Sequence, residues 1–531
     1  MAKTTRMLSS TTDQVLTPER TLCPHCDSFM TADYVNSRTL NTLSGVTRLH
    51  LTIRRCHNGT CQALRQPYRP EAEGRLALPH HEFGLDVITR IGHLRYAQHR
   101  SITEIHQILR ESGLAISVRT VTNLLDRYDE LLAVTLTDDS RLRSILTKQN
   151  RVILAIDGLQ PDVGHEVLWV IRDCLSGEIL LAKSLLSARQ QDLAALLVQV
   201  RQACPVKVIG IVSDGQHSIR KAVALTFPGV PHQLCHFHYL REAARPIYEA
   251  DRHAKKELKK KVRGVRGIER QVEDRTDPMA EVVRGYCSAV RSALTDDGRP
   301  PLDASGLKLH ARLSAIGHSL ARVGFQKALP QELIRLKSIV DRGLSSTAAL
   351  WPSIQVTFGW VHQVAHLLGQ DHLKGSQVRR QLAGLLGAMK QHRQAAGDLA
   401  VGVDHFVKVS RSYWPGLFHC FHVANLPRTN NDLEQTFGSH RYHERRATGR
   451  KGASPALVLR GSARLLAGLA TRKGEVSCHQ LASADRVCWG QLRSELQCRR
   501  DRQVDRRRFR KNPEKYLKTL ENKLNKLGLP S

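Results

Sequence analysis

Two aspartates in the sequence each follow a run of apolar residues that is typical of a buried strand. Asp157 comes directly after the run 152–156, and Asp214 comes after the run 206–212. A glycine follows each of them, and an isolated Asp-Gly pair would indicate only a turn. Two such carboxylates at the ends of neighbouring strands repel each other unless a cation lies between them. Mg²⁺ accepts oxygen ligands and leaves room for a phosphate oxygen, so the pair predicts metal-assisted phosphoryl-transfer chemistry.

A third carboxylate is expected to complete this metal site, and Glu434 is the candidate. Thr429 can cap a helix with Asp432 as the partner of a capping box, which would place Glu434 on the first turns. Asp432 and Glu444 remain alternative third ligands. The three carboxylates would hold two Mg²⁺ or Mn²⁺ ions about 3.5 to 4 Å apart, which would activate an attacking water or hydroxyl and stabilise the leaving oxygen.

Four cysteines near the N-terminus form a second candidate metal site. They occur as two close pairs, Cys23 with Cys26 and Cys56 with Cys61. Each short loop can turn two thiolates toward one ion, which is the arrangement of a tetrahedral Zn²⁺ site. His25 and His57 are possible substitute ligands, and reduced cysteines in a small β unit are the alternative. Because this segment is poor in large apolar side chains, we expect zinc to stabilise it.

The elements around the two aspartates have the order of a ribonuclease-H-like sheet in an α/β fold. The patterns predict three strands, a helix, a strand, a helix and a strand, over residues 152–156, 165–173, 179–185, 190–203, 206–212, 218–227 and 232–235. A Ser-Gly pair at 176–177 fits a hairpin turn. In this order the first and fourth strands lie side by side, so their carboxylates should converge. Residues 280–400 are mostly amphipathic helix.

The charge of the chain indicates a polyanionic partner. Its 531 residues include 80 Lys and Arg against 49 Asp and Glu, a formal net charge of +31. Such an excess destabilises a compact state by self-repulsion, which a nucleic-acid backbone relieves; a membrane surface and ribosomal RNA are the alternatives. No apolar stretch approaches the roughly 18 residues of a membrane span, and residues 1–10 lack the apolar core of a secretory signal. The expected location is the cytoplasm.

Two helices between the cysteines and the sheet are candidates for reading DNA. Three prolines and a glycine predict a linker at residues 67–79. A capping box then begins at Ser101, and Ser117 can cap a second helix. The pair fits a helix-turn-helix, and an ordinary helical hairpin is the alternative. The residues expected to face the bases are Val118, Arg119, Thr120 and Asn123.

Basic residues also follow Glu434 and would hold the DNA backbone beside the ions. They are Arg441, Arg445, Arg446, Arg450 and Lys451. The expected organisation is a zinc-binding module at 1–70, a helix-turn-helix domain at 80–147, a ribonuclease-H-like core at 150–245 and 426–475, an all-helical insertion at 246–425, and a basic C-terminal tail at 476–531.

The ordered combination of motifs over residues 150–455 resembles the DDE transposases of the Mutator-like superfamily and their bacterial insertion-sequence relatives. Members carry a C/D-x-x-H signature after the second acid, matched here by Cys235-His236-Phe237-His238, and an all-helical insertion before the glutamate. The resemblance implies that Cys235 and His238 support the active site or the DNA end without being catalytic acids. A metal or redox role for Cys235 with His236 stays open.

The resemblance further implies a function. The chain would bind terminal inverted repeats through its N-terminal modules, cut the element ends by Mg²⁺-dependent hydrolysis, and join each 3′-hydroxyl to target DNA. It would act as a homodimer or higher assembly at the bacterial nucleoid. The runner-up is a ribonuclease-H-fold nuclease or recombinase. A non-catalytic, zinc-containing DNA-binding protein descended from a transposase is the third class, and the presence of all three acids argues against it.

Overall fold

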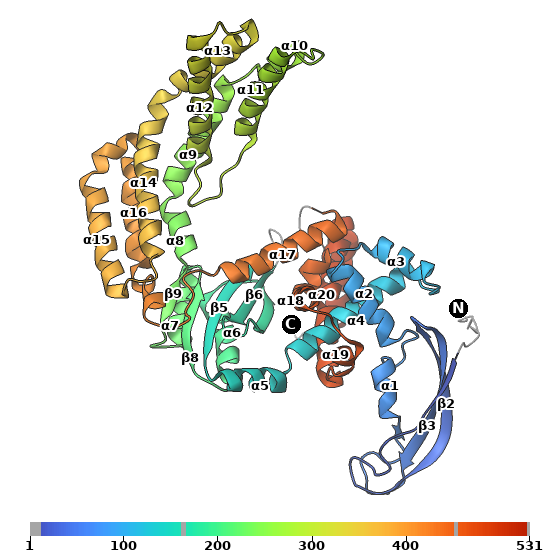
Figure 1. Ribbon diagram of the computed structural model, residues 1–531. Helices are drawn as coiled ribbons and strands as arrows, with labels where there is room; N and C mark the ends of the chain where they lie inside the picture. The colour runs from blue at the N-terminus through green and yellow to red at the C-terminus, as the bar shows by residue number, and fades with distance from the viewer. Residues whose placement is uncertain (1–11, 161–165, 451–454, 528–531) are drawn as a thin grey trace. The chain divides into compact units, whose positions relative to one another are not determined.

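A computed structural model describes residues 12–160, 166–450 and 455–527 of the chain (Figure 1). The fold is mixed α/β and contains two mixed β-sheets. The chain divides into two compact units. One consists of Met1–Asn150, Asp157–Val206 and Asp432–Ser531, and the other consists of Arg151–Ile156 and Lys207–Asn431. Each unit therefore joins segments that are far apart in the sequence.

The first sheet lies near the N-terminus. Its strands are β1 (Thr12–Leu16), β2 (Met30–Thr42), β3 (Gly45–Cys56) and β4 (Pro67–Tyr68). β3 is central, with β1 parallel to it and β2 and β4 antiparallel. The register pairs Met30 with Cys56, so the chain segments that carry the cysteines meet at one end of the sheet. A small apolar core around Leu40, Leu49 and Leu51 stabilises the rest of it.

The prediction of an unstructured linker at residues 67–79 is wrong. The segment contains β4 and the short helix α1 (Glu71–Leu76). Pro70 precedes the helix, where its missing N–H costs no helical hydrogen bond. The Glu73 carboxylate is buried and accepts hydrogen bonds from Arg38 at 2.7 Å and Arg69 at 2.6 Å. The proline therefore marks the start of a helix that these bonds anchor.

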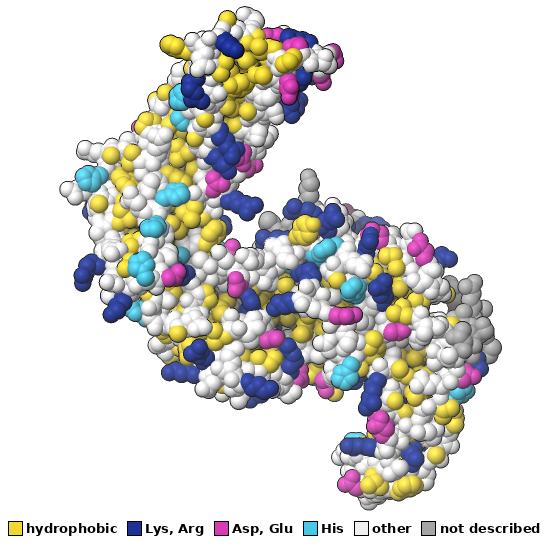
Figure 2. Space-filling view, viewed as in Figure 1, with side chains coloured by type: hydrophobic (Ala, Val, Ile, Leu, Met, Phe, Trp, Pro, Cys, Tyr) yellow, Lys and Arg dark blue, Asp and Glu magenta, His cyan; other side chains and the backbone are white. Residues whose placement is uncertain are grey.

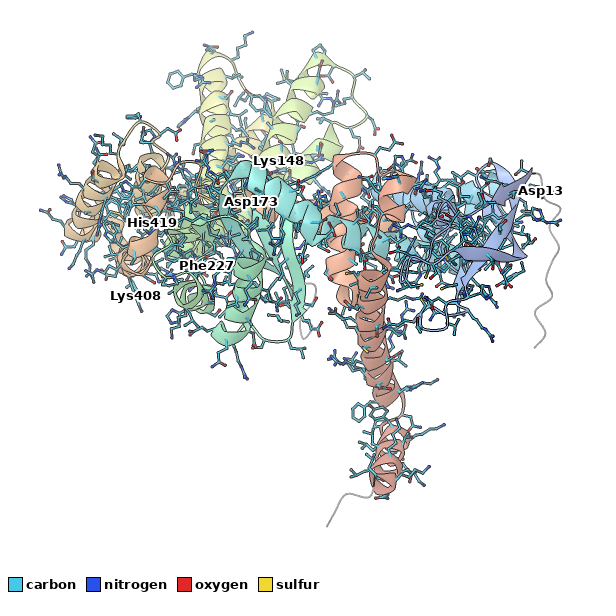
Figure 3. All side chains as sticks on the ribbon, turned by 90° about the horizontal axis from the view of Figure 1, so that it is seen from below. Asp13, Lys148, Asp173, Phe227, Lys408 and His419 are labelled. Carbon is cyan, nitrogen blue, oxygen red and sulfur yellow. The ribbon has the colours of Figure 1, made fainter. Side chains whose placement is uncertain are left out.

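The helices that follow confirm the predicted caps. They are α2 (Leu85–Tyr96), α3 (Ile102–Glu111), α4 (Val118–Leu136) and α5 (Asp139–Gln149). Ser101 and Glu104 form a capping box at α3, and the Ser117 hydroxyl accepts from the backbone N–H of Thr120 at α4. At the end of α5, beside Lys148, the Gln149 amide donates to Asp173 at 2.9 Å (Figure 3).

The C-terminal helices are α17 (Asn431–Thr448), α18 (Pro455–Lys473), α19 (Cys478–Ala482), α20 (Arg486–Lys511) and α21 (Pro513–Lys526). Of these, α18, α19 and α20 share a core with α2, α3 and α4. Ala467, Leu481 and Trp489 belong to the same apolar cluster as Ile91 and Leu125. The predicted C-terminal tail is therefore packed into this core at its start, whereas none of the described residues of α21 is buried.

The second sheet carries the two candidate aspartates. Its strands are β5 (Val152–Leu159), β6 (Val167–Asp173), β7 (Ile179–Leu185), β8 (Val208–Ser213) and β9 (His232–Leu234). Their order is β7-β6-β5-β8-β9; β6 and β7 are antiparallel, and β5, β8 and β9 are parallel. The helices α6 (Gln190–Ala203) and α7 (His217–Thr226) connect strands. The hairpin turn at Gly177, which has a φ of 75°, is confirmed.

The first strand of this sheet is longer than predicted. The apolar pattern ends at Ile156, but β5 continues through Asp157 to Leu159. The side chains of Val167 and Trp169 crowd Gly158, where an added Cβ would lie 2.9 Å from Val167. Glycine thus permits a close approach that the apolar pattern does not reveal.

Helices make up most of the second unit. They are α8 (His236–Ala243), α9 (Arg245–Lys261), α10 (Val265–Gln271), α11 (Pro278–Thr295), α12 (Ser305–Gln326), α13 (Gln331–Ser346), α14 (Trp351–Leu368), α15 (Gly375–Gln391) and α16 (Ala400–Tyr413). They pack around two apolar clusters, one including Val361 and Phe406 and the other Leu313 and Val340. Among the described residues, no helix is both long enough and apolar enough to cross a membrane.

Candidate functional site

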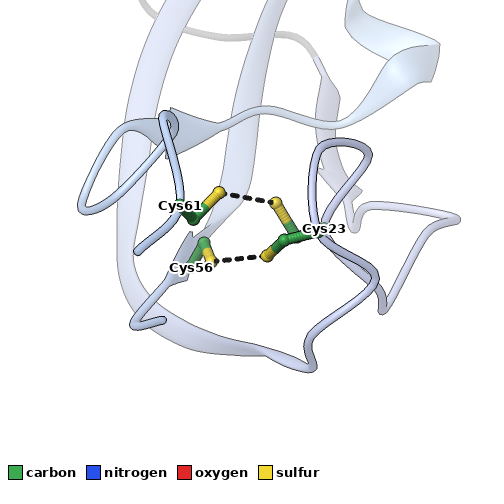
Figure 4. Close-up of side chains that lie close together, drawn as sticks. Cys23, Cys56 and Cys61 are labelled. Atoms are coloured by element: carbon green, nitrogen blue, oxygen red, sulfur yellow. Dashed lines mark hydrogen bonds between the residues drawn. The ribbon is translucent and has the colours of Figure 1, made fainter. Parts of the chain in front are cut away.

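The four N-terminal cysteines converge into one cluster, as the sequence predicts. The Sγ atoms of Cys23 and Cys61 lie 3.8 Å apart, and those of Cys26 and Cys56 lie 3.6 Å apart (Figure 4). All four lie within 4.8 Å of one another. Tight turns supply the two loops: the backbone N–H of Cys23 donates to the carbonyl of Ser28 at 2.8 Å, and that of Arg65 donates to Cys56 at 3.0 Å.

This geometry fits a structural metal ion. A tetrahedral zinc with Zn–S bonds of about 2.3 Å requires sulfurs about 3.8 Å apart. The observed separations are far from the roughly 2.05 Å of a disulfide, and all four cysteines are free. Hydrogen bonds from Ser28 lower the pKa of Cys26 to about 6, whereas burial and the neighbouring thiols raise the pKa values of Cys56 and Cys61, so without a metal the thiolate is favoured at Cys26 alone of these three. His25 and His57 are not members of the cluster. The four thiols could therefore hold a metal such as zinc.

The register of the second sheet bears on the two aspartates. β5 and β8 are adjacent and parallel, and Ile156 pairs with Ser213. Asp157 and Asp214 are each the next residue along these strands. Both carboxylate-bearing residues are half-buried. Each of the two neighbouring strands therefore has an aspartate directly after a residue that pairs with the other strand.

A small hydrogen-bond network connects the residue before α17 to β5 and to the end of β8. The Asn430 side-chain amide donates to the carbonyl of Ile156 at 3.2 Å, directly before Asp157. The backbone N–H of Asn430 donates to the Cys235 sulfur at 3.3 Å, and the backbone N–H of Cys235 donates to the carbonyl of Ser213 at 2.8 Å. Cys235 therefore joins the end of β8 to the loop that leads into α17.

The two histidines of the Cys235–His238 motif have different surroundings. A ring nitrogen of His238 lies within 4.8 Å of the Cys235 sulfur. The His236 ring is buried and its Nε2 hydrogen-bonds to the carbonyl of Leu417 at 2.8 Å. Burial lowers the pKa of His236 to about 4. These contacts favour a packing role for His236 over a pairing with Cys235 at a metal.

Glu434 lies on the first turn of α17, as predicted from the sequence. The helix begins at Asn431, so the residue that precedes it is Asn430 and not the predicted Thr429. The Asn430 side-chain amide is hydrogen-bonded to Ile156 of the sheet. The rival Glu444 is buried and lies 3.5 Å from Arg464 and 3.9 Å from Arg95. The rival Asp432 is exposed. Glu444 is thus engaged by arginines, which makes it a poor ligand for a further cation.

The residues predicted to contact DNA are mostly on the surface. Val118, Arg119 and Asn123 of α4 are exposed, whereas Thr120 is half-buried and its hydroxyl lies 2.9 Å from that of Ser117. The four arginines predicted to hold the DNA backbone are all exposed: Arg441, Arg445, Arg446 and Arg450. Lys451 lies outside the described residues. In the view of Figure 2, Lys and Arg side chains are spread widely over the visible face.

The immediate surroundings of Asp214 were not predicted from the sequence. The Tyr413 hydroxyl donates to the carbonyl of Asp214 at 3.1 Å, and Arg220 lies over the Tyr413 ring, 4.5 Å from its centroid. Arg220 also donates to the carbonyl of Gly215 at 2.7 Å. Gly215 has a φ of 86°, and an added Cβ would meet the Tyr413 ring at 2.8 Å. No local pattern predicts a contact between residues 199 positions apart.

The sequence also did not predict the ion cluster between α4 and α18. Arg460 lies 3.1 Å from Asp126 and 2.8 Å from Glu130, and Arg464 lies 3.3 Å from Asp129. All five side chains are buried. The only local signal of this cluster is the helical spacing of the acids on α4, since Asp129 and Glu130 follow Asp126 by three and four residues.

Comparison with models of known protein families found no match, and comparison with curated proteins found none either. The assignment of a function therefore depends on the residues and contacts described above.

Proposed function

We propose that this chain is a DDE transposase of an insertion sequence, with the second sheet as a ribonuclease-H-like core and the helices between β9 and α17 as an insertion. One observation carries the proposal: Asp157 and Asp214 follow paired residues on adjacent parallel strands, and the loop leading to Glu434 is hydrogen-bonded to one of those paired residues, Ile156. The three acidic residues come from distant parts of the sequence, and the residues Ile156, Ser213 and Asn430 that precede them are connected by strand pairing and a hydrogen bond.

The chemistry of the donor set fits a hard divalent cation. Asp157, Asp214 and Glu434 would hold Mg²⁺ or Mn²⁺, which would supply a nucleophile from water or a 3′-hydroxyl and stabilise the leaving oxygen. The residues of the chain position this set. Cys235 and Asn430 hold the strand ends and the start of α17 together, and Tyr413 and Gly215 fix the turn after Asp214.

The remaining surfaces serve DNA in this proposal. Zinc at the four cysteines orders the N-terminal sheet, and the exposed start of α4 recognises the terminal inverted repeats. The exposed arginines of α17 hold backbone phosphates. A homodimer or higher assembly at the nucleoid would bring two element ends together.

Strand transfer by the purified protein tests the proposal. A supercoiled target plasmid and a duplex carrying one element end are incubated with Mg²⁺, and joined products are quantified. Asp157→Asn and Glu434→Gln should each lower joining at least about a hundredfold, the cost typical of removing one group that stabilises a transition state. Asp432→Asn is the matched control, because it changes an exposed carboxylate on the same turn.

The outcomes separate the alternatives. Full joining by Asp157→Asn at equal protein concentration would refute the catalytic assignment. Cutting without joining would favour a nuclease. Equal losses of joining activity in Asp432→Asn and Glu434→Gln would mean that Glu434 is wrongly assigned as the third metal ligand.

A further inference from the structure

A groove in the second unit is lined almost entirely by cations. It has a volume of about 470 Å³, and its walls come from α9, from Arg263 just after α9, from the loop before α12 and from the first residue of α12. The residues that line it are Arg252, Lys255, Lys256, Lys259, Lys260, Arg263, Asp297 and Ser305. Six cations thus face one carboxylate, and the groove has no aromatic or aliphatic residue in its lining.

The helical repeat explains why these cations lie together. Arg252, Lys256, Lys259 and Arg263 are three or four residues apart, so they follow one face of α9 and its end. The opposite face is buried in the helical core through residues such as Ala254 and Leu258. At 1.5 Å per residue, the basic face extends over about 14 Å from Arg252 to the end of α9 at Lys261.

Much of this charge is not neutralised by the protein. Lys255 lies 2.7 Å from Asp297, and Lys260 lies 2.6 Å from Glu257. Among the described residues, no carboxylate lies within ion-pair distance of Arg252, Lys256 or Arg263. Burial, and then the charge of Lys255, lower the pKa of Lys259. Cations at this spacing on one helix repel each other, so a bound polyanion would stabilise the arrangement.

We propose that this α9 groove binds the phosphodiester backbone of DNA, as a sequence-independent contact separate from the acidic residues. The inference rests on the proposed function in taking DNA as the substrate. Two properties favour a nucleic acid over other polyanions. A DNA strand carries a phosphate about every 3.4 Å along the axis, which suits a line of cations. A membrane-binding helix would place large apolar side chains beside its cations, and this lining has none.

The role follows from the chemistry of the lining. Lys and Arg make up most of it, and these side chains supply many of the phosphate contacts that position DNA without selecting its sequence. The groove would hold the DNA backbone by charge. The helices of the second unit thus supply a backbone clamp.

Binding of a fluorescent 40-base-pair duplex to the full chain tests this role. Anisotropy is measured at several salt concentrations without added divalent metal, so that no cutting is needed for the readout. Two fourfold variants with the same change in charge are compared. The groove variant carries Arg252→Gln, Lys256→Gln, Lys259→Gln and Arg263→Gln. The control carries Arg322→Gln, Lys327→Gln, Arg335→Gln and Arg342→Gln, which change exposed cations of α12, α13 and the loop between them.

The groove variant should bind about tenfold more weakly. Its plot of log affinity against log salt should be less steep by about 0.9 for each phosphate that the variant no longer neutralises, or up to about 3.6 for four phosphates. A randomised duplex should show the same loss of affinity. Charge-preserving Lys256→Arg and Lys259→Arg should retain full binding.

Three results would overturn the inference. The first is an equal loss of affinity in the groove and control variants. The second is a loss confined to one DNA sequence. The third is a groove-dependent affinity for vesicles of anionic lipid that equals the affinity for DNA. Because binding is read without catalysis, a chain that fails to join strands but shows the groove effect would contradict only the proposed function.

Discussion

Loss of metal from the four-cysteine cluster should disorder one end of the N-terminal sheet and leave the other end folded. The sheet contains two separate clusters of buried side chains. One consists of Leu16, Leu40, Leu49, Leu51, Ile53 and Ala77, and the other of Met30 with three of the cysteines. The first cluster is apolar and does not depend on a metal. The second has one large apolar residue besides cysteine.

The magnitudes indicate that the metal is the larger contribution at the cysteine end. Full burial of Met30 contributes about 1.5 to 3 kcal/mol. A structural zinc held by protein ligands contributes on the order of 10 kcal/mol at neutral pH. Since each 1.4 kcal/mol is a tenfold change, amide exchange at this end should accelerate by several orders of magnitude when zinc is removed. Amides between Leu49 and Leu51 should keep most of their protection.

Hydrogen–deuterium exchange on the full chain checks this. The reporting amides are those of Cys23, Met30 and Arg65, which are hydrogen-bonded in the two cysteine loops. Chelation or Cys56→Ser should release them together, whereas Cys498→Ser, at an exposed cysteine, should not. The reasoning is refuted if purified protein holds no zinc yet protects these amides, or if chelation leaves their exchange unchanged.

Two further predictions concern the buried charges of the first unit. Arg460→Met should lower the free energy of unfolding by up to about 3 to 5 kcal/mol in urea titrations, because it removes the buried cation that Asp126 and Glu130 share and leaves them only their ion pairs with Arg500 and Arg127. Arg508→Met, at an exposed pair with Asp505, should cost less than about 1 kcal/mol. Similar costs for the two variants would show that the Arg460 contacts contribute no more than an exposed ion pair. Burial lowers the pKa of His440 from 6.5 to about 4, so the unfolded chain takes up this proton first as pH falls. The contribution of this group to the free energy of unfolding should therefore be full above about pH 6.5 and decrease by about 1.4 kcal/mol per pH unit toward pH 4. His440→Leu should remove this part of the pH dependence. An unchanged dependence of the unfolding free energy on pH would mean that another group is responsible.

Elements whose signal is local were predicted with little error. The helix α6 and the strand β7 have the predicted bounds, because a hydrophobic periodicity of 3.6 or 2 is a property of neighbouring residues. The caps at Ser101 and Ser117 are local for the same reason. The pairing of the cysteines is nearly local, since one antiparallel register brings their loops together. The acidic triad itself stays a prediction.

The sequence by itself determined which residues are acidic, basic or thiol-bearing and which short segments are helical or extended. Tertiary structure decided what those residues contact. It bound Asn430 to Ile156 of β5, engaged Glu444 with Arg464, and brought Tyr413 to the carbonyl of Asp214. The physical reason is that these contacts join residues tens to hundreds of positions apart, and their formation depends on the packing of whole elements, which no spacing along the chain encodes.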